Sequence, residues 1–251
     1  GVVISCKKLS DTKPFDRFDE LSVWASKSNA MGFVYGTYTD VVQGLYTNQI
    51  GTEVWTNNIV ATAGTAFTRD QISRDDDFGF NQFGRIRRCN LIVEKSAASP
   101  TMSDPDKAEI AAHGKFLRAM TYYWLARRFG RVIYIDKVLT ENEESYSLPQ
   151  TATIAETYSL IMKDIDEAVA GLPAAVTPGV ASKWTAYALK SEVALQAAAY
   201  TGDNAYYNTA LAAADSVIGS GKFALEADYE GMFNERRRFS TAIILALYRV
   251  K

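Results

Sequence analysis

Apolar residues recur at three- and four-residue spacing over most of the chain, which is the period of an amphipathic α-helix. The pattern predicts six helices, over residues 31–45, 80–93, 106–129, 153–172, 183–200 and 204–219. The last two follow each other closely and carry small residues that allow tight packing, at Ala188, Ala194, Ala210 and Ala214. We therefore predict an all-α fold with long irregular loops, in which antiparallel helix pairs are similar to tetratricopeptide units.

Residues that begin and end helices stand at the predicted boundaries. Thr153 and Glu156 form a capping-box pattern, Ser182 can cap the fifth helix, and Gly130 can end the third. Segment 241–248 instead reads as a β-strand. The third helix is expected to lie in the core through an apolar face made by Phe116, Leu117, Met120 and Trp124.

Residues 48–77 lose the helical period and are rich in Thr, Asn and Gly. Long loops in compact domains often carry function. An indole can stack on the apolar face of a pyranose ring, while amides and charged groups bind hydroxyls. The candidate ligand-binding residues are therefore Trp55, Asn57, Asn58, Arg69 and Asp70. In the alternative interpretation, Trp55 only packs the loop onto the helices.

The loop ends in three consecutive carboxylates at Asp75, Asp76 and Asp77. Carboxylate oxygens can bind calcium, but the glycine and distant glutamate of an EF-hand loop are missing at the required offsets. Capping of the following helix explains the run better. We predict no metal site and no cofactor.

Composition excludes some functional classes. Hydrophobic residues make up 47% and charged residues 22% of the 251 positions, which is typical of a globular protein. A net charge of -2 argues against nucleic acid as a partner, because such proteins need a basic face. The chain lacks an apolar run of about 18 residues that could cross a membrane as a helix.

Catalytic patterns are also missing. His113 is the only histidine, and a single histidine inside a predicted helix is more often structural than catalytic. The carboxylate pairs at Asp164 and Asp166 and at 143–144 are expected on solvated surfaces. No nucleophile elbow, metalloprotease motif or phosphate-binding loop occurs. We therefore predict that the protein is not an enzyme.

The first residues have the pattern of a lipoprotein processing site. Val3, Ile4 and Ser5 precede Cys6, and a polar stretch follows it. This arrangement predicts lipidation of Cys6, with residues 1–16 as leader remnant and tether and residues 17–251 as one helical domain. We expect both ends of the chain to be truncations.

Five segments in register resemble the SusD/RagB family of outer-membrane lipoproteins. The most specific is 113–132, HGKFLRAMTYYWLARRFGRV, which is similar to the family's "G-x-(A/K)-x-F-L-R-A-x-x-Y-x-x-L-x-x-x-F-G-x-V-P" helix. The other segments carry Asn29, Gly36 and Tyr38; Ile86, Cys89 and Asn90; Tyr158, Asp164 and Pro173; and Gly221, Tyr229 and Phe233. Ile133 departs from the pattern, since the family usually has proline there.

This resemblance implies a SusD-like fold with tetratricopeptide-like helix pairs. It also implies a lipid anchor on the cell surface, in the outer membrane, and a SusC-like TonB-dependent transporter as partner. The ligand would be an oligosaccharide or another nutrient. Family members are considerably longer, so part of the ligand surface is expected to be absent here. The alternative function is a tetratricopeptide-type protein-interaction scaffold without a small ligand.

Overall fold

The computed structural model describes residues 20–46, 78–140, 147–234, 236–237 and 239–246. In these residues the fold is helical and contains no β-strand. The N-terminal helices are α1 (Glu20–Val23), α2 (Lys27–Tyr38) and α3 (Gly44–Tyr46), with a π-helical turn, η1 (Thr39–Gln43), between the last two. The longer helices are α5 (Phe83–Ala97), α6 (Asp104–Phe129), α7 (Ile154–Gly171), α8 (Lys183–Thr201) and α9 (Ala205–Gly219). A short 3-10 turn, η5 (Glu230–Met232), follows them.

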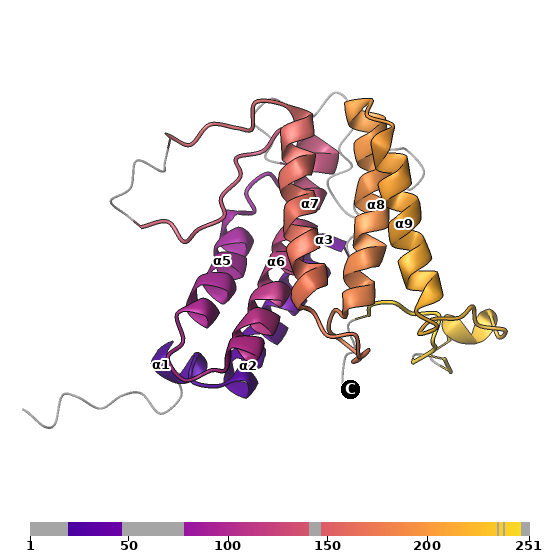
Figure 1. Cartoon of the computed structure of the whole chain (residues 1–251), viewed down its shortest axis with the longest axis horizontal. Helices are drawn as coiled ribbons and strands as arrows, with labels where there is room; N and C mark the ends of the chain where they lie inside the picture. The colour runs from indigo at the N-terminus through magenta and orange to yellow at the C-terminus, as the bar shows by residue number, and fades with distance from the viewer. Residues whose placement is uncertain (1–19, 47–77, 141–146, 235, 238, 247–251) are drawn as a thin grey trace, which may run out of the picture.

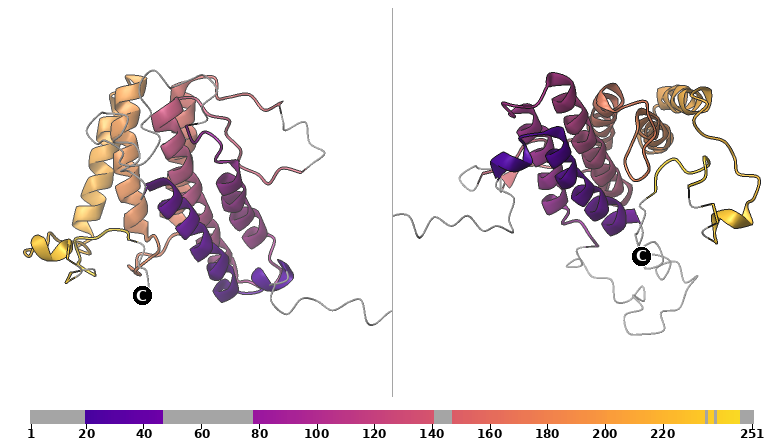
Figure 2. Two further views of the ribbon diagram at one scale, coloured as in Figure 1. Left: turned by 180° about the vertical axis from the view of Figure 1, so that it is seen from behind. Right: turned by 90° about the horizontal axis from the view of Figure 1, so that it is seen from below.

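Successive long helices lie side by side. Helices α5, α6, α7, α8 and α9 form a row in which each packs on the next (Figure 1). Helix α2 packs against α5 and α6 on the face of the row that is seen from behind in Figure 2. The most extensive contact joins α8 to α9, the pair predicted to resemble a tetratricopeptide unit. The all-α prediction is therefore confirmed.

Helix α6 forms the centre of the core. From Ala112 to Ala126 all but one of its residues are buried, so it is covered on every side by its neighbours. Phe116, Leu117, Met120 and Trp124 are buried, as predicted. Its N-terminus is capped by Ser103, whose hydroxyl accepts a hydrogen bond from Asp106 N, and it ends at Gly130, where φ is 72°.

Most predicted helix ends are confirmed. Thr153 caps α7 by accepting a hydrogen bond from the backbone N–H of Glu156. Ser182 caps α8 and completes a capping box with Thr185. At Gly202, φ is 72° and ψ 6°, the left-handed conformation that glycine adopts without steric cost at a helix end.

The helix predicted over 31–45 is present, with a π-helical turn, η1, inside it. Two other predictions about local structure were wrong. Helix α5 has Gln82 at its N-cap, so the carboxylates at 75–77 do not cap it. Residues 240–246 form turns and bends instead of a strand. A strand needs a neighbour for its backbone groups, and Ile244 O accepts instead from the hydroxyl of Thr185.

Candidate functional site

The residues predicted to contact ligand all fall in segment 47–77, which lies outside the residues that the structure describes. This applies to Trp55, Asn57, Asn58, Arg69 and Asp70, and the lipidation candidate Cys6 lies outside them as well. Their positions relative to one another therefore stay predictions. The residues on either side of the segment are described, and they fix where it leaves and rejoins the helices.

The described residues that flank segment 47–77 meet at the side chain of Trp124 on α6. The indole Nε1–H donates to Leu45 O at 3.0 Å, just before the segment. After the segment, Gly79 lies so close to the ring that a Cβ there would be 2.6 Å from Trp124 Cη2. Its φ of 84° also favours glycine. Leu45 and Gly79, on either side of the segment, therefore lie close together beside Trp124.

Aromatic and cationic groups surround this anchor. Phe80 packs edge-on against Phe129, with ring centroids 5.1 Å apart, and the hydroxyl of Tyr46 donates to Met120 O at 2.7 Å. The guanidinium of Arg128 lies 3.7 Å from the centroid of the Trp124 ring. Burial, followed by the charge of Arg127, lowers the pKa of Arg128. The base of the segment is thus fixed by packed rings and hydrogen bonds.

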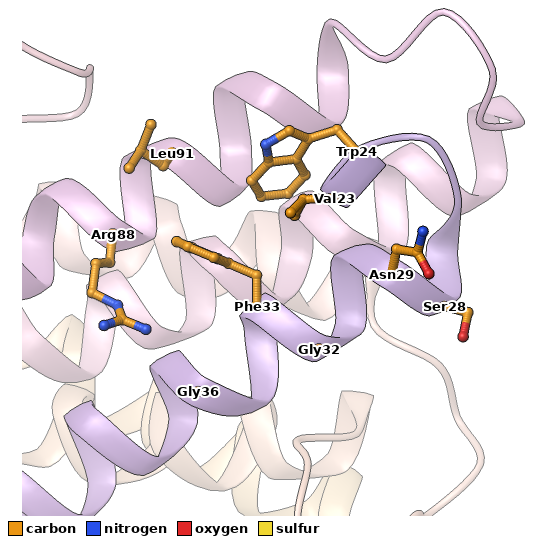
Figure 3. A pocket seen from close by; sticks show the side chains of 9 residues that line it. All are labelled: Val23, Trp24, Ser28, Asn29, Gly32, Phe33, Gly36, Arg88 and Leu91. Carbon is orange, nitrogen blue, oxygen red and sulfur yellow. The ribbon is translucent and has the colours of Figure 1, made fainter. Parts of the chain in front are cut away.

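A hollow lies between α1, α2 and α5, at the N-terminal end of α2. Its volume is about 780 Å³, within the range of sites that hold small ligands. Figure 3 shows the rings of Trp24 and Phe33 beside this hollow, with Arg88 and Leu91 projecting from α5. The sequence patterns did not identify it, because its residues come from three helices.

A buried polar network joins α5, α6 and α7 to the segment after α6. Arg118 Nε donates to Asp164 Oδ2 at 2.8 Å, and Arg118 Nη1 donates to Asn90 Oδ1 at 2.8 Å. Asp164 also accepts from the hydroxyl of Tyr134 at 2.7 Å, and Asn90 donates to Ile135 O at 3.0 Å. Asp164 is only 2% exposed, so its predicted place on a solvated face was wrong.

The charges of Arg118 and Asp164 form a buried ion pair within this network. Burial lowers the pKa of Arg118, but the hydrogen bonds and charge of Asp164 outweigh it and hold that pKa above its ordinary value. Burial and then the charge of Asp164 raise the pKa of Tyr134. These groups satisfy one another inside the bundle, so we assign the network to structure and not to ligand binding.

His113 occupies a structural position, as its sequence context predicted. It is 1% exposed, and its Nδ1 lies 2.8 Å from the hydroxyl of Tyr38. That hydroxyl oxygen also accepts a hydrogen bond from Ala181 N at 3.0 Å. The Tyr38 O–H can therefore donate to a neutral His113, which links α2, α6 and the residues before α8.

Comparison with protein families gives one match over most of the chain. Residues 18–195 match the SusD-like family described as starch-binding associating with outer membrane. No match was found among curated proteins. Among the described helices, none is long and apolar enough to cross a membrane.

Solved structures with the same fold cover nearly the whole chain. A SusD-like protein from Bacteroides fragilis has 26% identity and a TM-score of 0.73, covering 91% of this chain and 46% of its own. A laminarin-binding SusD-like protein has 24% identity and a TM-score of 0.67, covering 87% of this chain and 50% of its own. A structure with xylogluco-oligosaccharide has 19% identity and a TM-score of 0.66, covering 92% of this chain and 46% of its own.

The chain therefore spans about half the length of the solved structures that it matches. The family match extends from the residues just before α1 into α8, and the structural matches share the helical fold. The resemblance seen in the sequence is confirmed, and the chain belongs to the SusD-like family.

Proposed function

We propose that this chain is part of a cell-surface protein that binds oligosaccharides and passes them to a SusC-like TonB-dependent transporter. The family match over residues 18–195 is the observation that carries this proposal. Two structural relatives support it, one described as laminarin-binding and the other determined with xylogluco-oligosaccharide. The protein acts by capture and not by catalysis, and its one histidine is buried in a hydrogen bond to Tyr38.

Segment 47–77 is proposed to carry part of the binding surface. Trp55 would stack on a sugar ring, and Asn57, Asn58, Arg69 and Asp70 would bind its hydroxyl groups. The fixed base at Trp124 supports this placement, because a binding loop is most effective when rigid elements hold its ends. The longer protein is expected to supply the rest of the surface.

Attachment to the membrane is proposed to occur through a lipid on Cys6, which precedes the helical domain by a polar stretch. The transporter would then lie beside the lipid-anchored protein in the outer membrane. The family description, which places these proteins in association with that membrane, supports this location.

A protein-interaction scaffold is the second candidate function. The outer side of α9 exposes large apolar side chains at Tyr207, Leu211 and Ile218, which recur at helical spacing. Helical-repeat proteins use neighbouring helices or partner proteins to cover such faces. A scaffold would use this surface without binding any sugar.

A glycan array separates the two functions. The protein should bind a subset of neutral oligosaccharides, and laminarin- and xyloglucan-derived oligosaccharides are the first to test. Binding to no glycan, combined with stable association with the transporter, would favour the scaffold and contradict the proposed function.

A further inference from the structure

The hollow between α1, α2 and α5 is built for an apolar group. Val23, Trp24, Phe33 and Leu91 form its walls, and the rings of Trp24 and Phe33 lie 5.5 Å apart at 58°. The backbone of α2 forms one side, where Gly32 has open space at the position that a Cβ would occupy. A side chain of even moderate size at Gly32 would fill this space.

One cation stands at the edge of this apolar surface. Arg88 Cζ lies 5.2 Å from the centroid of the Phe33 ring, and a Cβ on Gly36 would lie 3.3 Å from Arg88 Nη2. The guanidinium is therefore held across the groove between α5 and α2. Figure 3 shows Arg88 projecting from α5 toward the side of α2 that carries Phe33 and Gly36.

The Nε–H of Arg88 is buried and has no hydrogen-bond partner in the part of the chain that the structure describes. Leaving a buried charged donor unpaired costs free energy, and most buried polar groups in proteins are paired. The neighbouring Arg85 illustrates the usual outcome, since its Nε donates to Asp40 at 3.1 Å. Among the described residues, the Arg88 cation is therefore incompletely compensated, and an anion in the groove beside its guanidinium would compensate it.

We propose that this groove binds a small ligand that combines an apolar ring with a single carboxylate. The ring would enter between Phe33, Leu91 and the open side of α2 at Gly32. The carboxylate would accept from Arg88, whose planar fork matches its two oxygens. One cation in an apolar hollow balances a carboxylate better than a doubly charged phosphate. The described residues that line this site are distinct from the residues proposed to bind oligosaccharide.

A matched pair of probes tests the charge requirement. Binding of 3-phenylpropionate and of its neutral amide, 3-phenylpropanamide, to the 251-residue chain would be measured by ligand-observed nuclear magnetic resonance. The acid should bind at least about tenfold more tightly than the amide, because a hydrogen bond to a charged group is much stronger than one to a neutral group. Equal affinities, or no binding of either probe, would overturn the proposal.

Arg88→Gln should remove the preference for the acid and leave the two probes equal. Arg87→Gln is the matched control, since Arg87 lies next to it on α5 but donates to Leu139 O and does not line the groove. Arg87→Gln should keep the tenfold preference. If Arg88→Gln keeps it too, the carboxylate does not bind at Arg88.

Gly32→Leu tests the location without removing a charge. The new side chain would occupy the open space beside α2, and replacing a helical glycine favours the helix, so the variant is expected to fold. Circular dichroism and thermal melting would verify this. Affinity for 3-phenylpropionate should fall at least about tenfold; unchanged affinity in the folded variant would place the ligand elsewhere.

Discussion

At the scale of single residues, the ion pair between Arg118 and Asp164 is the most demanding arrangement in the core. The side chains of both are almost fully buried, and they come from α6 and α7. A buried charge is tolerated only when its partner and hydrogen bonds are in place. The pair should therefore be sensitive to the loss of either charge.

Asp164→Asn should lower the free energy of unfolding by about 3–5 kcal/mol, because it leaves the Arg118 cation buried without its counter-charge. Urea denaturation would measure the loss. Asp166→Asn is the matched control on the same helix, where the half-exposed Asp166 pairs with Lys190. That change should cost less than about 1 kcal/mol. Equal losses for the two variants would mean that the buried pair contributes no special stability.

His113 should make stability depend on pH. Burial, followed by the charge of Lys27, lowers its pKa from 6.5 to about 4. His113 is therefore protonated near pH 6.5 in the unfolded chain but only near pH 4 in the folded chain. The stabilisation that comes from neutral His113 is complete at neutral pH and is lost as the pH falls from 6.5 to about 4. The difference between the two pKa values corresponds to about 3 kcal/mol in the free energy of unfolding.

His113→Gln removes the titrating group and keeps a polar side chain near Tyr38. Unfolding of both proteins would be measured from pH 7 down to pH 4. The wild type should lose stability more steeply than the variant over this range. Parallel curves would show that His113 does not control the acid sensitivity.

The environments of some of these residues could be predicted from the sequence, and those of others could not. The single histidine was correctly predicted to be structural. Asp164 was misassigned because a carboxylate in an amphipathic helix is normally solvated, and its partner Arg118 lies 46 positions earlier. Asn90, Arg118 and Asp164 all belong to the segments that resemble the family, and the structure brings them together inside the bundle. That juxtaposition depends on how three helices pack, which no local pattern contains.

At the scale of secondary-structure elements, α6 organises the bundle and Trp124 connects it to α3. The indole is 8% exposed and bonded to Leu45 O. Trp124→Ala should lower the free energy of unfolding by about 3–5 kcal/mol, through lost packing and a cavity. Trp184→Ala is the control, because Trp184 is only half-buried on α8. This substitution should lower the free energy of unfolding by about 1 kcal/mol. If thermal melts show that Trp124→Ala lowers the free energy of unfolding by less than about 1 kcal/mol, α6 is not the centre of the core.

Helix positions could be predicted because apolar periodicity, caps and glycine stops agreed with one another. The errors lie where tertiary contacts override that local agreement. The helix predicted over 31–45 is present, but its turn at Thr39–Gln43 is π-helical and lies next to Arg85, whose Nε donates to the carbonyl of Asp40 at 3.1 Å. Segment 241–248 has strand-like composition, but a strand also needs a partner, and composition does not provide one.

At the scale of the whole molecule, attachment and ligand capture follow from the family proposal. We predict that Cys6 is acylated in the native bacterium, since Val3, Ile4 and Ser5 form a lipoprotein processing pattern before it. Mass spectrometry of the membrane fraction should detect a lipid-modified N-terminal cysteine. A soluble, unmodified protein that begins upstream of Cys6 would contradict this prediction.

The candidate ligand residues could be predicted only as a group. Loss of helical period marked residues 48–77, and residue chemistry selected Trp55 and its polar neighbours within them. Sugar-binding surfaces are shallow and rely on stacking, so they leave no fixed spacing of residues in a sequence. The anchoring of the segment at Trp124 was not predictable either, because it joins residues far apart in the chain.

The most direct test of oligosaccharide binding is calorimetry on the full-length protein with a glycan selected from the array. Trp55→Ala should weaken binding at least about fivefold, because stacking on an exposed indole contributes about 1 kcal/mol or more. It should leave the melting temperature nearly unchanged, while the control Trp184→Ala leaves the affinity unchanged. Unchanged affinity in Trp55→Ala, or a large fall in its melting temperature, would contradict the account and make Trp55 a residue that packs the loop onto the helices.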